Sequence, residues 1–241
     1  MKFQPKYQRF GECAILVEWP AKIDKDILSD ILLFKFSVEN RLKHIVEVNT
    51  AYHSLLVVYK NHFSFEEEVG RLKEIYRNPS EIKPRPSRLW KIPVCYDDDF
   101  GIDLDALSKG KKLSKKEVVQ MHSKAIYTVY FIGFLPGFLY LGGLDETLHI
   151  PRKAVPRLKI EKGAVAIGGG QTGVYPSESP GGWHIIGNSP ISFFDPHKEQ
   201  PCFASALDQV QFVPISRSGY EDIKTLVKEG LYQMESEVID G

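Results

Sequence analysis

The fold is decided by FIGFLPGFLYLGGLDETLHIPRKAVPRLKI (residues 131–160) and, two residues later, by GAVAIGGGQTGVYPSESPGGWHIIGNSP (residues 163–190). Twelve of the chain's 19 glycines lie between Gly133 and Gly187. Glycine permits positive φ and lets other groups approach the backbone closely. Here it alternates with short apolar runs at Val129–Phe134, Ala164–Ile167 and Trp183–Ile186. The pattern is typical of short strands joined by tight turns, and it predicts a closed or rolled β-structure.

Polar side chains between these glycines favour a binding site over an ordinary barrel with glycine corners. They are Arg152, Arg157, Gln171, Thr172, Tyr175 and Glu178. Residues 149–163 hold five Lys and Arg side chains against one acid, Glu161, in a chain that is neutral overall. Two arginines, each preceded by a proline, could hold a carboxylate or phosphate through two parallel hydrogen bonds. A solvated basic loop is the alternative.

The run Gly168–Gly173 could offer free backbone N–H groups to an anion, as an anion-binding nest does. Gly169, Gly170, Gln171 and Thr172 are its candidate contacts. No Gly-Lys-Ser/Thr follows and no helix pattern begins there, so the run is neither a Walker motif nor a dinucleotide fingerprint. No nucleophile elbow surrounds the nearby serines. Tyr175, Glu178 and His184 could exchange protons only if the fold brings them together.

Composition places the chain among globular proteins, with 43% hydrophobic and 26% charged residues. The 31 basic residues equal the 31 acidic ones, so no global field favours nucleic acid or an anionic membrane surface. Three widely spaced cysteines show neither metal-ligand spacing nor a disulfide framework, which favours a reducing cytoplasm. No run approaches the roughly 20 apolar residues that cross a bilayer.

The N-terminal third reads as a small α+β domain. A strand at Cys13–Trp19 precedes a helix capped by Asp24, and strands follow at His44–Asn49 and Ser54–Tyr59. A capping box of Ser64 and Glu67 then predicts a second helix, and Arg88–Val94 a last strand. This βαββαβ order predicts a ferredoxin-like sandwich. A looser α+β domain that borrows its last strand from the next domain is the alternative.

Two prolines in Lys83-Pro84-Arg85-Pro86-Ser87 mark a linker, so we expect an α+β domain at 1–86 and a mainly-β domain at 87–241. Asp97-Asp98-Asp99 is read as solvated surface rather than as a metal site. A second capping box, Ser114 with Glu117, predicts a helix that carries His122. Further expectations are a strand at Gln209–Ile215, a closing helix at Ser218–Gly230 and frayed residues from Glu235 onward.

GFLPGFLYLGGLDETLHIPRKAVPR, GGGQTGVYPSESPGGW and IIGNSP resemble the signature of the KipI-like family, also known as the B subunits of 5-oxoprolinase or as allophanate hydrolase subunit 1. The resemblance extends less densely from Pro93 to about Pro214. It implies a cyclophilin-like β-barrel at about 88–230, a fold that periodicity alone could not select. In places this chain departs from the usual family wording. The departures are at Leu139, Lys153, Val155, Gly168, His184 and Asn188. Asn188 stands where the family commonly has an arginine, so an anion-binding role at this position is in doubt.

The resemblance implies a subunit of an ATP-dependent 5-oxoprolinase, which opens pyroglutamate to glutamate. Its expected partners are a KipA-like protein, which is the C subunit, and a YcsF/LamB-like protein, which is the A subunit. ATP, and Mg with it, is expected to be used by the complex. The alternative is a KipI-type inhibitor that binds a sensor histidine kinase; a prolyl isomerase is suggested by the barrel alone.

The same resemblance, together with residue type, gives the expected site. The expected catalytic residues are His122, Arg157 and Glu178. The expected substrate or anion contacts are Arg152, Gly169, Gly170, Gln171, Thr172 and Tyr175, and no metal ligand is expected.

Overall fold

The computed structural model describes residues 2–81 and 86–239. The chain divides into two compact units, Met1–Arg85 and Pro86–Gly241, and each is described by itself. Most of the linker expected at 83–87 lies outside the described residues.

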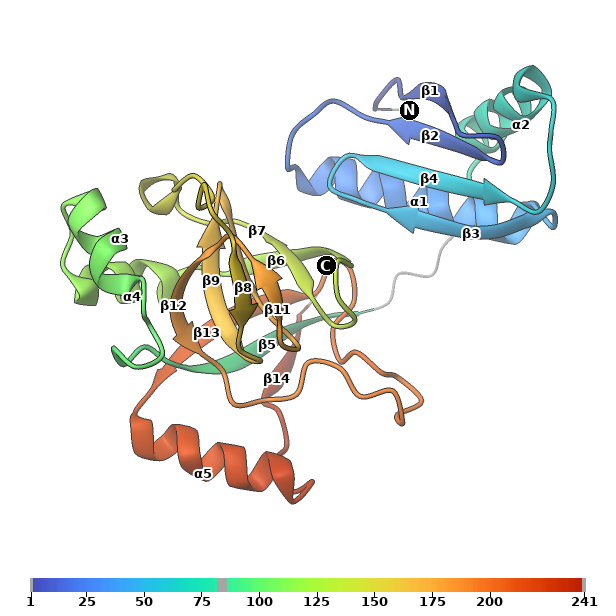
Figure 1. Ribbon diagram of the computed structural model, residues 1–241. Coiled ribbons are helices and arrows are strands. Elements are labelled where there is room, and N and C mark those ends of the chain that lie inside the picture. The colour runs from blue at the N-terminus through green and yellow to red at the C-terminus, as the bar shows by residue number, and fades with distance from the viewer. Residues whose placement is uncertain (1, 82–85, 240–241) are drawn as a thin grey trace. The chain divides into compact units, whose positions relative to one another are not determined.

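The first unit is an antiparallel four-stranded sheet with two helices on one face (Figure 1). The strands run in the order β1-β2-β4-β3. The elements are β1 (Lys6–Phe10), β2 (Ala14–Glu18), α1 (Lys25–Arg41), β3 (Ile45–Thr50), β4 (Ser54–Tyr59) and α2 (Phe65–Arg77). Asp24 caps α1 as expected, because its carboxylate accepts from the backbone N–H groups of Asp26 and Ile27. Ser64 begins α2, but the capping box expected with Glu67 does not form its side-chain bond.

The ferredoxin-like expectation for this unit needs a correction, since the element order is ββαββα. The strand expected at Arg88–Val94 does exist as β5 (Ser87–Cys95), but it belongs to the large sheet of the second unit. The edge beside β2 is occupied instead by β1, which pairs antiparallel from Lys6 opposite Glu18 to Phe10 opposite Ala14. β1 is mostly exposed, so it has no hydrophobic alternation that could have revealed it.

The second unit is built on an eight-stranded sheet that curls toward closure. Its order is β10-β9-β12-β5-β13-β6-β7, with β14 added to β5, and the end strands β10 and β7 also contact each other. A separate pair, β11 with β8, lies outside this sheet. The strands are β6 (Tyr127–Ile132), β7 (Leu139–Gly142), β8 (Arg157–Ile160), β9 (Ala164–Gly168), β10 (Gln171–Val174), β11 (Ser179–Gly181), β12 (His184–Asn188), β13 (Gln209–Ile215) and β14 (Ser236–Ile239). The nearly closed sheet fits the cyclophilin-like barrel implied by the resemblance.

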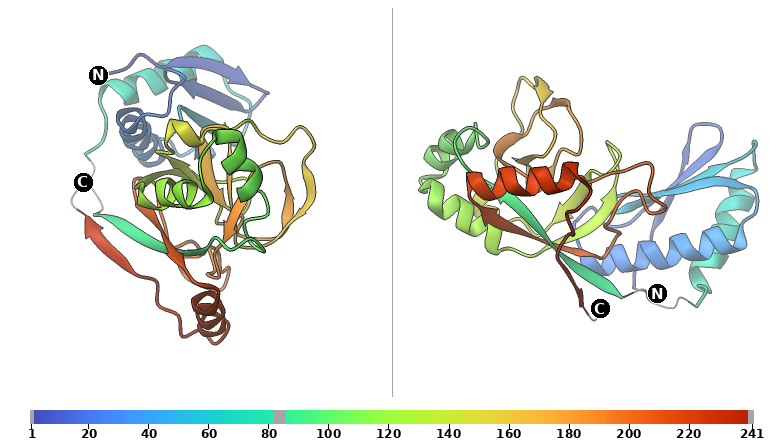
Figure 2. Two further views of the ribbon diagram at one scale, coloured as in Figure 1. Left: turned by 90° about the vertical axis from the view of Figure 1, so that its left-hand side faces the viewer. Right: turned by 90° about the horizontal axis from the view of Figure 1, so that it is seen from below.

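Three helices flank this sheet (Figures 1 and 2). α3 (Leu104–Lys111) and α4 (Lys115–Lys124) pack side by side, and α5 (Arg217–Lys228) contacts β5. The capping box at Ser114 and Glu117 is confirmed at the start of α4. The expectation of frayed residues from Glu235 onward is wrong for Ser236–Ile239, because these residues pair with β5 as β14.

The barrel interior is filled by apolar side chains from the strands and from α3 and α4. Tyr127, Phe193, Phe212, Ile92 and Leu104 are among the largest fully buried ones. A smaller apolar cluster, which includes Phe138, Ile160, Tyr175 and Trp183, lies apart from this core. That second cluster forms the wall of the candidate site.

Candidate functional site

A pocket of about 300 Å³ lies in the second unit, where the glycine-rich signature folds back on itself. Aromatic rings and proline- and glycine-bearing backbone make its walls, and two cations border it. The lining residues are Phe134, Phe138, Tyr140, Arg152, Lys153, Pro156, Tyr175, Pro180, Gly181, Gly182 and Trp183. Of the nine site residues expected from sequence, this pocket brings together Arg152 and Tyr175.

The ring of Phe138 organises the pocket wall. Its centre lies 5.7 Å from those of Tyr175 and Trp183 and 5.0 Å from that of Tyr140. Two glycines make room for these rings: a Cβ at Gly168 would lie 2.4 Å from Trp183 Cδ1, and one at Gly181 would lie 2.3 Å from Tyr175 Oη. Glycine is therefore required here for close approach of side chains rather than for anion binding.

Arg152 supplies the pocket with a positive charge. Its guanidinium lies over the indole of Trp183, 5.6 Å from the ring centre, which is a cation–π arrangement. Among the described residues, no carboxylate forms an ion pair with it. Burial raises the pKa of Tyr175 and of Tyr140, and the nearby Arg152 charge opposes that rise in both. Both phenols are thus neutral at physiological pH, and the pocket combines an apolar wall with one available cation.

Arg157 does hold a carboxylate through two hydrogen bonds, but that carboxylate is Asp103 of the same chain. Both guanidinium nitrogens donate to Asp103 at 2.8 Å, and Lys153 Nζ lies 2.9 Å from Asp103 Oδ1. The backbone N–H of Ile185 donates to the same carboxylate at 2.8 Å. Burial raises the pKa of Asp103, but these hydrogen bonds outweigh burial and hold it below its usual range. The geometry makes Arg157 a positioning residue, because its fork-shaped donor is already occupied.

His122 lies in the barrel interior with both ring nitrogens bonded. Thr172 donates its hydroxyl to the Ala166 carbonyl at 3.1 Å, so it accepts from His122 Nε2–H at 2.8 Å. Nδ1 then accepts from the Tyr96 hydroxyl at 2.8 Å. Burial lowers the pKa of His122 to about 3, so the imidazole is neutral at pH 7. This fully buried ring offers no face to a substrate, and its expected catalytic role has no support in this geometry.

Residues 168–173, the expected anion nest, make contacts within the barrel. Gly169, with a φ of 65°, makes the tight turn between β9 and β10. Its N–H donates to the Ile150 carbonyl at 2.7 Å, and it accepts from Ile150 in return. Gly170 lies against the imidazole of His149, and Gln171 begins β10 opposite Gly168. The role of these residues and of Thr172 in anion binding stays a prediction.

Glu178, the last of the expected site residues, and two other residues noted from sequence, His184 and Asn188, each have separate partners. Glu178 is exposed and pairs with Lys159 at 2.8 Å. His184 shares a hydrogen bond of 3.1 Å with the Pro151 carbonyl, and Asn188 bonds to Tyr220 and to the Lys162 carbonyl. The three residues read from sequence as a proton-exchanging set, Tyr175, Glu178 and His184, thus have separate partners.

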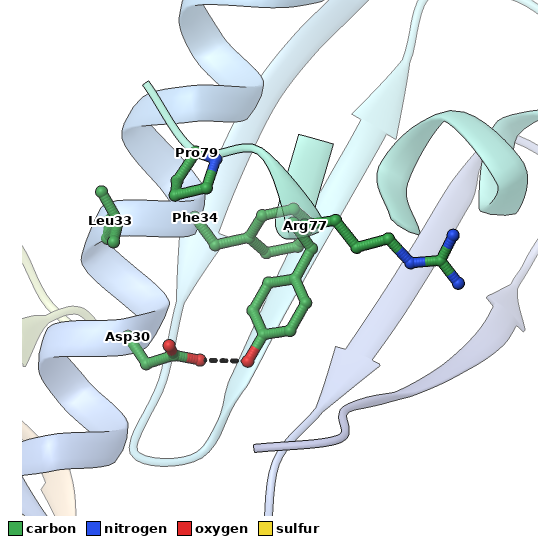
Figure 3. Close-up of a pocket in the computed structure, with 6 residues that line it drawn as sticks. Asp30, Leu33, Phe34, Arg77 and Pro79 are labelled. Carbon is green, nitrogen blue, oxygen red and sulfur yellow. Dashed lines mark hydrogen bonds between the residues drawn. The ribbon is translucent and has the colours of Figure 1, made fainter. Parts of the chain in front are cut away.

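A pocket of about 250 Å³ in the first unit has a structural explanation (Figure 3). Asp30 lies at its edge and accepts from the Tyr76 hydroxyl at 2.5 Å and from Trp19 Nε1 at 2.7 Å. The guanidinium of Arg77 points away from Asp30 in Figure 3. Asp30 therefore joins two buried aromatic side chains of the core of this unit.

The acidic run Asp97-Asp98-Asp99 is solvated surface that pairs with nearby cations. Asp98 pairs with Lys115 at 2.6 Å, and Asp99 pairs with Arg217 at 3.3 Å. Within residues 2–81 and 86–239, no group of three or more His, Cys, Asp or Glu side chains could hold a metal ion. In the same ranges no helix is long and apolar enough to cross a membrane.

Sequence reasoning missed Asp103, the group that organises the cations beside the pocket. An aspartate just before a helix is read as an N-cap, yet Asp103 makes no side-chain cap bond to α3. Phe138 and Trp183 belong both to the small apolar cluster and to the pocket lining. The glycine on which the ring of Trp183 packs, Gly168, lies 15 residues earlier in the chain, so local spacing gave no signal for this contact.

Comparison with known proteins gives concordant matches. The model of the family described as "Carboxyltransferase domain, subdomain C and D" matches residues 5–204. The chain is 41% identical to the 5-oxoprolinase B subunit of Escherichia coli O157:H7, over 72% of this chain and 79% of that one. It is 33% identical to the 5-oxoprolinase B subunit of Bacillus subtilis (strain 168), over 93% and 98% respectively.

Among solved structures, the crystal structure of TTHA0988 matches with a TM-score of 0.72 and 30% identity. The match covers 85% of this chain and 40% of that one. The chain therefore spans about two fifths of the length of that structural relative.

Proposed function

We propose a function from one premise: the chain belongs to the family of 5-oxoprolinase B subunits. We propose that it is the B subunit of an ATP-dependent complex that opens 5-oxo-L-proline to L-glutamate. Its partners are then a KipA-like C subunit and a YcsF/LamB-like A subunit. Three free cysteines and the absence of a disulfide among the described residues support a cytoplasmic location for this complex.

The position of Arg152 at an aromatic pocket is the observation that carries this proposal. 5-Oxoproline is a compact five-membered lactam that bears one carboxylate. A pocket of about 300 Å³ holds one such ring, and the walls formed by Phe138 and Trp183 suit its CH₂ groups. The guanidinium of Arg152, which has no carboxylate partner among the described residues, can receive the carboxylate through two hydrogen bonds. The neutral hydroxyl of Tyr175 is a further donor.

The chain's own residues bind and orient the substrate. Asp103 holds Lys153 and Arg157 on either side of Pro156 and so fixes the loop that carries Arg152. The described lining of the pocket contains no Asp, Glu, His, Ser or Cys, and its lysine, Lys153, is ion-paired with Asp103, so the lining lacks the side chains that most often accept a proton from an attacking water. The proton-accepting side chain therefore comes from a partner protein in our proposal.

ATP belongs to the complex rather than to this chain in our proposal. When bound, ATP can phosphorylate the amide oxygen and turn it into a better leaving group. Two groups expected to hold phosphate already have partners within this chain, since the N–H of Gly169 is bonded to Ile150 and Arg157 is bonded to Asp103. We therefore propose that ATP, with Mg, is held with the help of the partner proteins.

The test is reconstitution with the YcsF/LamB-like and KipA-like proteins, followed by an assay of ADP and glutamate released from 5-oxoproline. Arg152→Ala removes one partner of a charged hydrogen-bonded pair, which costs roughly 2–5 kcal/mol, so kcat/KM should fall about 30-fold or more. Arg9→Ala is the matched control, because Arg9 is also exposed and lies 5.2 Å over an aromatic ring, that of Phe65. A complex that assembles with the wild-type chain but releases no glutamate would refute the function.

An inhibitor of a sensor histidine kinase is the alternative that the family resemblance allows. Inhibition by binding does not require a ring-sized pocket with a cation at its edge. Direct titration of the isolated chain with 5-oxoproline separates the two functions, since only the enzyme component is expected to bind it and to lose that binding in Arg152→Ala.

A further inference from the structure

A second cavity, of about 740 Å³, lies in the second unit and shares no lining residue with the candidate pocket. Its size falls within the roughly 300–1,000 Å³ typical of sites for small organic ligands. Half of its lining comes from the loop between β12 and β13, and most of the rest comes from the end of α5 and the segment after it. The lining residues are Trp90, Lys162, Ile191, Ser192, Phe193, Asp195, Lys198, Gln200, Pro201, Phe203, Val227, Lys228, Gly230, Tyr232, Gln233 and Met234. The proposed function uses none of them.

The loop between β12 and β13 runs from Ser189 to Asp208 without a helix or strand (Figure 1). Irregular connections longer than about 12–15 residues are uncommon in compact domains, and most of them are either functional loops or linkers. This loop is anchored to the barrel, because Ile191 and Phe193 are buried in its core and the N–H of Asp195 donates to the Pro201 carbonyl at 2.9 Å. A linker role does not fit a loop held in this way, so its length favours a functional loop.

Aromatic and apolar side chains form the base of this cavity. The ring of Phe203 lies edge-on to Trp90, with ring centres 5.0 Å apart, and 5.7 Å from the ring of Phe193. Trp90, Phe203, Tyr232 and Met234 all pack against the barrel core. Burial raises the pKa of Tyr232, so its phenol is neutral at physiological pH and can donate a hydrogen bond. The base of the cavity therefore suits a ligand with an apolar body.

The charged side chains of the lining leave a positive surplus. Lys162, Lys198 and Lys228 come from three separate segments, and Asp195 is the one acid in the lining, so three minus one leaves two positive charges. Among the described residues, none of these lysines forms an ion pair. Ammonium groups without a carboxylate partner can receive an anionic group of a ligand, and a surplus of two charges matches a dianion such as a phosphate monoester.

We propose that this cavity is a second ligand site of the chain, and that it takes an amphipathic phosphate monoester. The apolar body of the ligand lies against Trp90 and Phe203, and its phosphate is held by the lysines. The site is distinct from the one proposed for 5-oxoproline, which is smaller and carries a single negative charge. The inference does not depend on the proposed function, because it rests on a separate cavity.

The probe is octyl phosphate, titrated into the full chain by isothermal calorimetry at about pH 8, where a phosphate monoester carries two negative charges. Octanol and octyltrimethylammonium present the same apolar chain with no charge and with a positive charge. Octyl phosphate should bind at least about tenfold more tightly than octanol, and octyltrimethylammonium should bind more weakly than either. If octyl phosphate does not bind, or binds no more tightly than octanol, the proposal is wrong.

Charge reversal at the lysines locates the site. Lys198→Glu and Lys228→Glu should each weaken binding of octyl phosphate about tenfold, because an attraction to a dianion becomes a repulsion, and should leave binding of octanol unchanged. Lys43→Glu and Lys116→Glu are the matched controls. All four lysines are exposed and form no ion pair among the described residues, so these variants should fold like wild type and the controls should bind within about threefold of it.

Three outcomes of the variant series would overturn the proposal. Cavity variants that bind octyl phosphate like wild type, or controls that weaken it equally, would show that the phosphate lies elsewhere. Displacement of octyl phosphate by 5-oxoproline would assign the bound phosphate to the substrate pocket instead. Binding that meets these tests in a chain whose reconstituted complex leaves 5-oxoproline intact would support the second site and refute only the proposed function.

Discussion

Asp103→Asn removes one negative charge from beneath the pocket loop and keeps the size of the side chain. Asp103 is 4% exposed and accepts from Arg157, Lys153 and the Ile185 N–H. Loss of one partner of a buried ion pair costs about 3–5 kcal/mol. The side chains of Arg157 and Lys153 are 29% and 25% exposed and can be partly solvated, so we expect about 2–3 kcal/mol. For a unit of this size that corresponds to a fall in Tm of roughly 4–12 °C.

The assay is thermal unfolding of the full chain at pH 7, combined with hydrogen exchange of the Ile185 amide. That amide donates directly to Asp103, so its exchange should accelerate in Asp103→Asn. Asp222→Asn is the control, since Asp222 is exposed on α5 and forms no ion pair among the described residues.

The effect should also depend on pH. The pKa of Asp103 is depressed in the folded state, so its stabilisation is present above the unfolded-state pKa and is lost as pH falls through the folded-state pKa. The difference between wild type and Asp103→Asn should therefore shrink below about pH 4. Equal Tm values at pH 7, with unchanged exchange at Ile185, would refute the view that Asp103 holds the loop.

Two further predictions concern stability and domain structure. The pKa of buried His122 falls to about 3, so protons bind the unfolded state first as pH drops below about 6.5, and stability is lost between those values. His122→Gln, which cannot be protonated, should remove roughly 2 kcal/mol of the loss between pH 7 and pH 5 in urea unfolding. An unchanged pH profile would contradict this, because it would mean that His122 binds a proton as readily in the folded state as in the unfolded state. Residues 87–241 expressed alone should unfold cooperatively in circular dichroism, and a molten fragment would mean that the boundary at residue 86 is misplaced.

Local chemistry determined which parts of the fold were predictable. The helix after Asp24, the capping box at Ser114 and the strand at Gln209–Ile215 are signalled by neighbours within a few residues. β1 and β14 were missed because both are short edge strands with mostly exposed side chains. Their pairing, with β2 and with β5, depends on hydrogen bonds between backbones, which leave no periodic pattern in the sequence.

In the candidate site, too, sequence revealed local features but not contacts between residues far apart along the chain. Arg152 and Tyr175 could be selected because they lie within the glycine-rich signature itself. The pairing of Arg157 with Asp103 and of His122 with Thr172 could not be predicted, because the two residues of each pair are 54 and 50 residues apart along the chain. Residue type correctly indicated that Arg157 would hold an anion through two hydrogen bonds, yet it could not indicate that the anion belongs to the protein.

The glycines of the signature show what such a motif can and cannot reveal. A run of glycines favours an anion nest when its N–H groups are free, but here the N–H of Gly169 is bonded to Ile150. Gly168 and Gly181 instead let Trp183 and Tyr175 pack against the backbone. The motif thus builds an aromatic wall and leaves Arg152 as its available cation. In our proposal this pocket selects a small ring with one carboxylate, and the group that reacts with the ring comes from a partner.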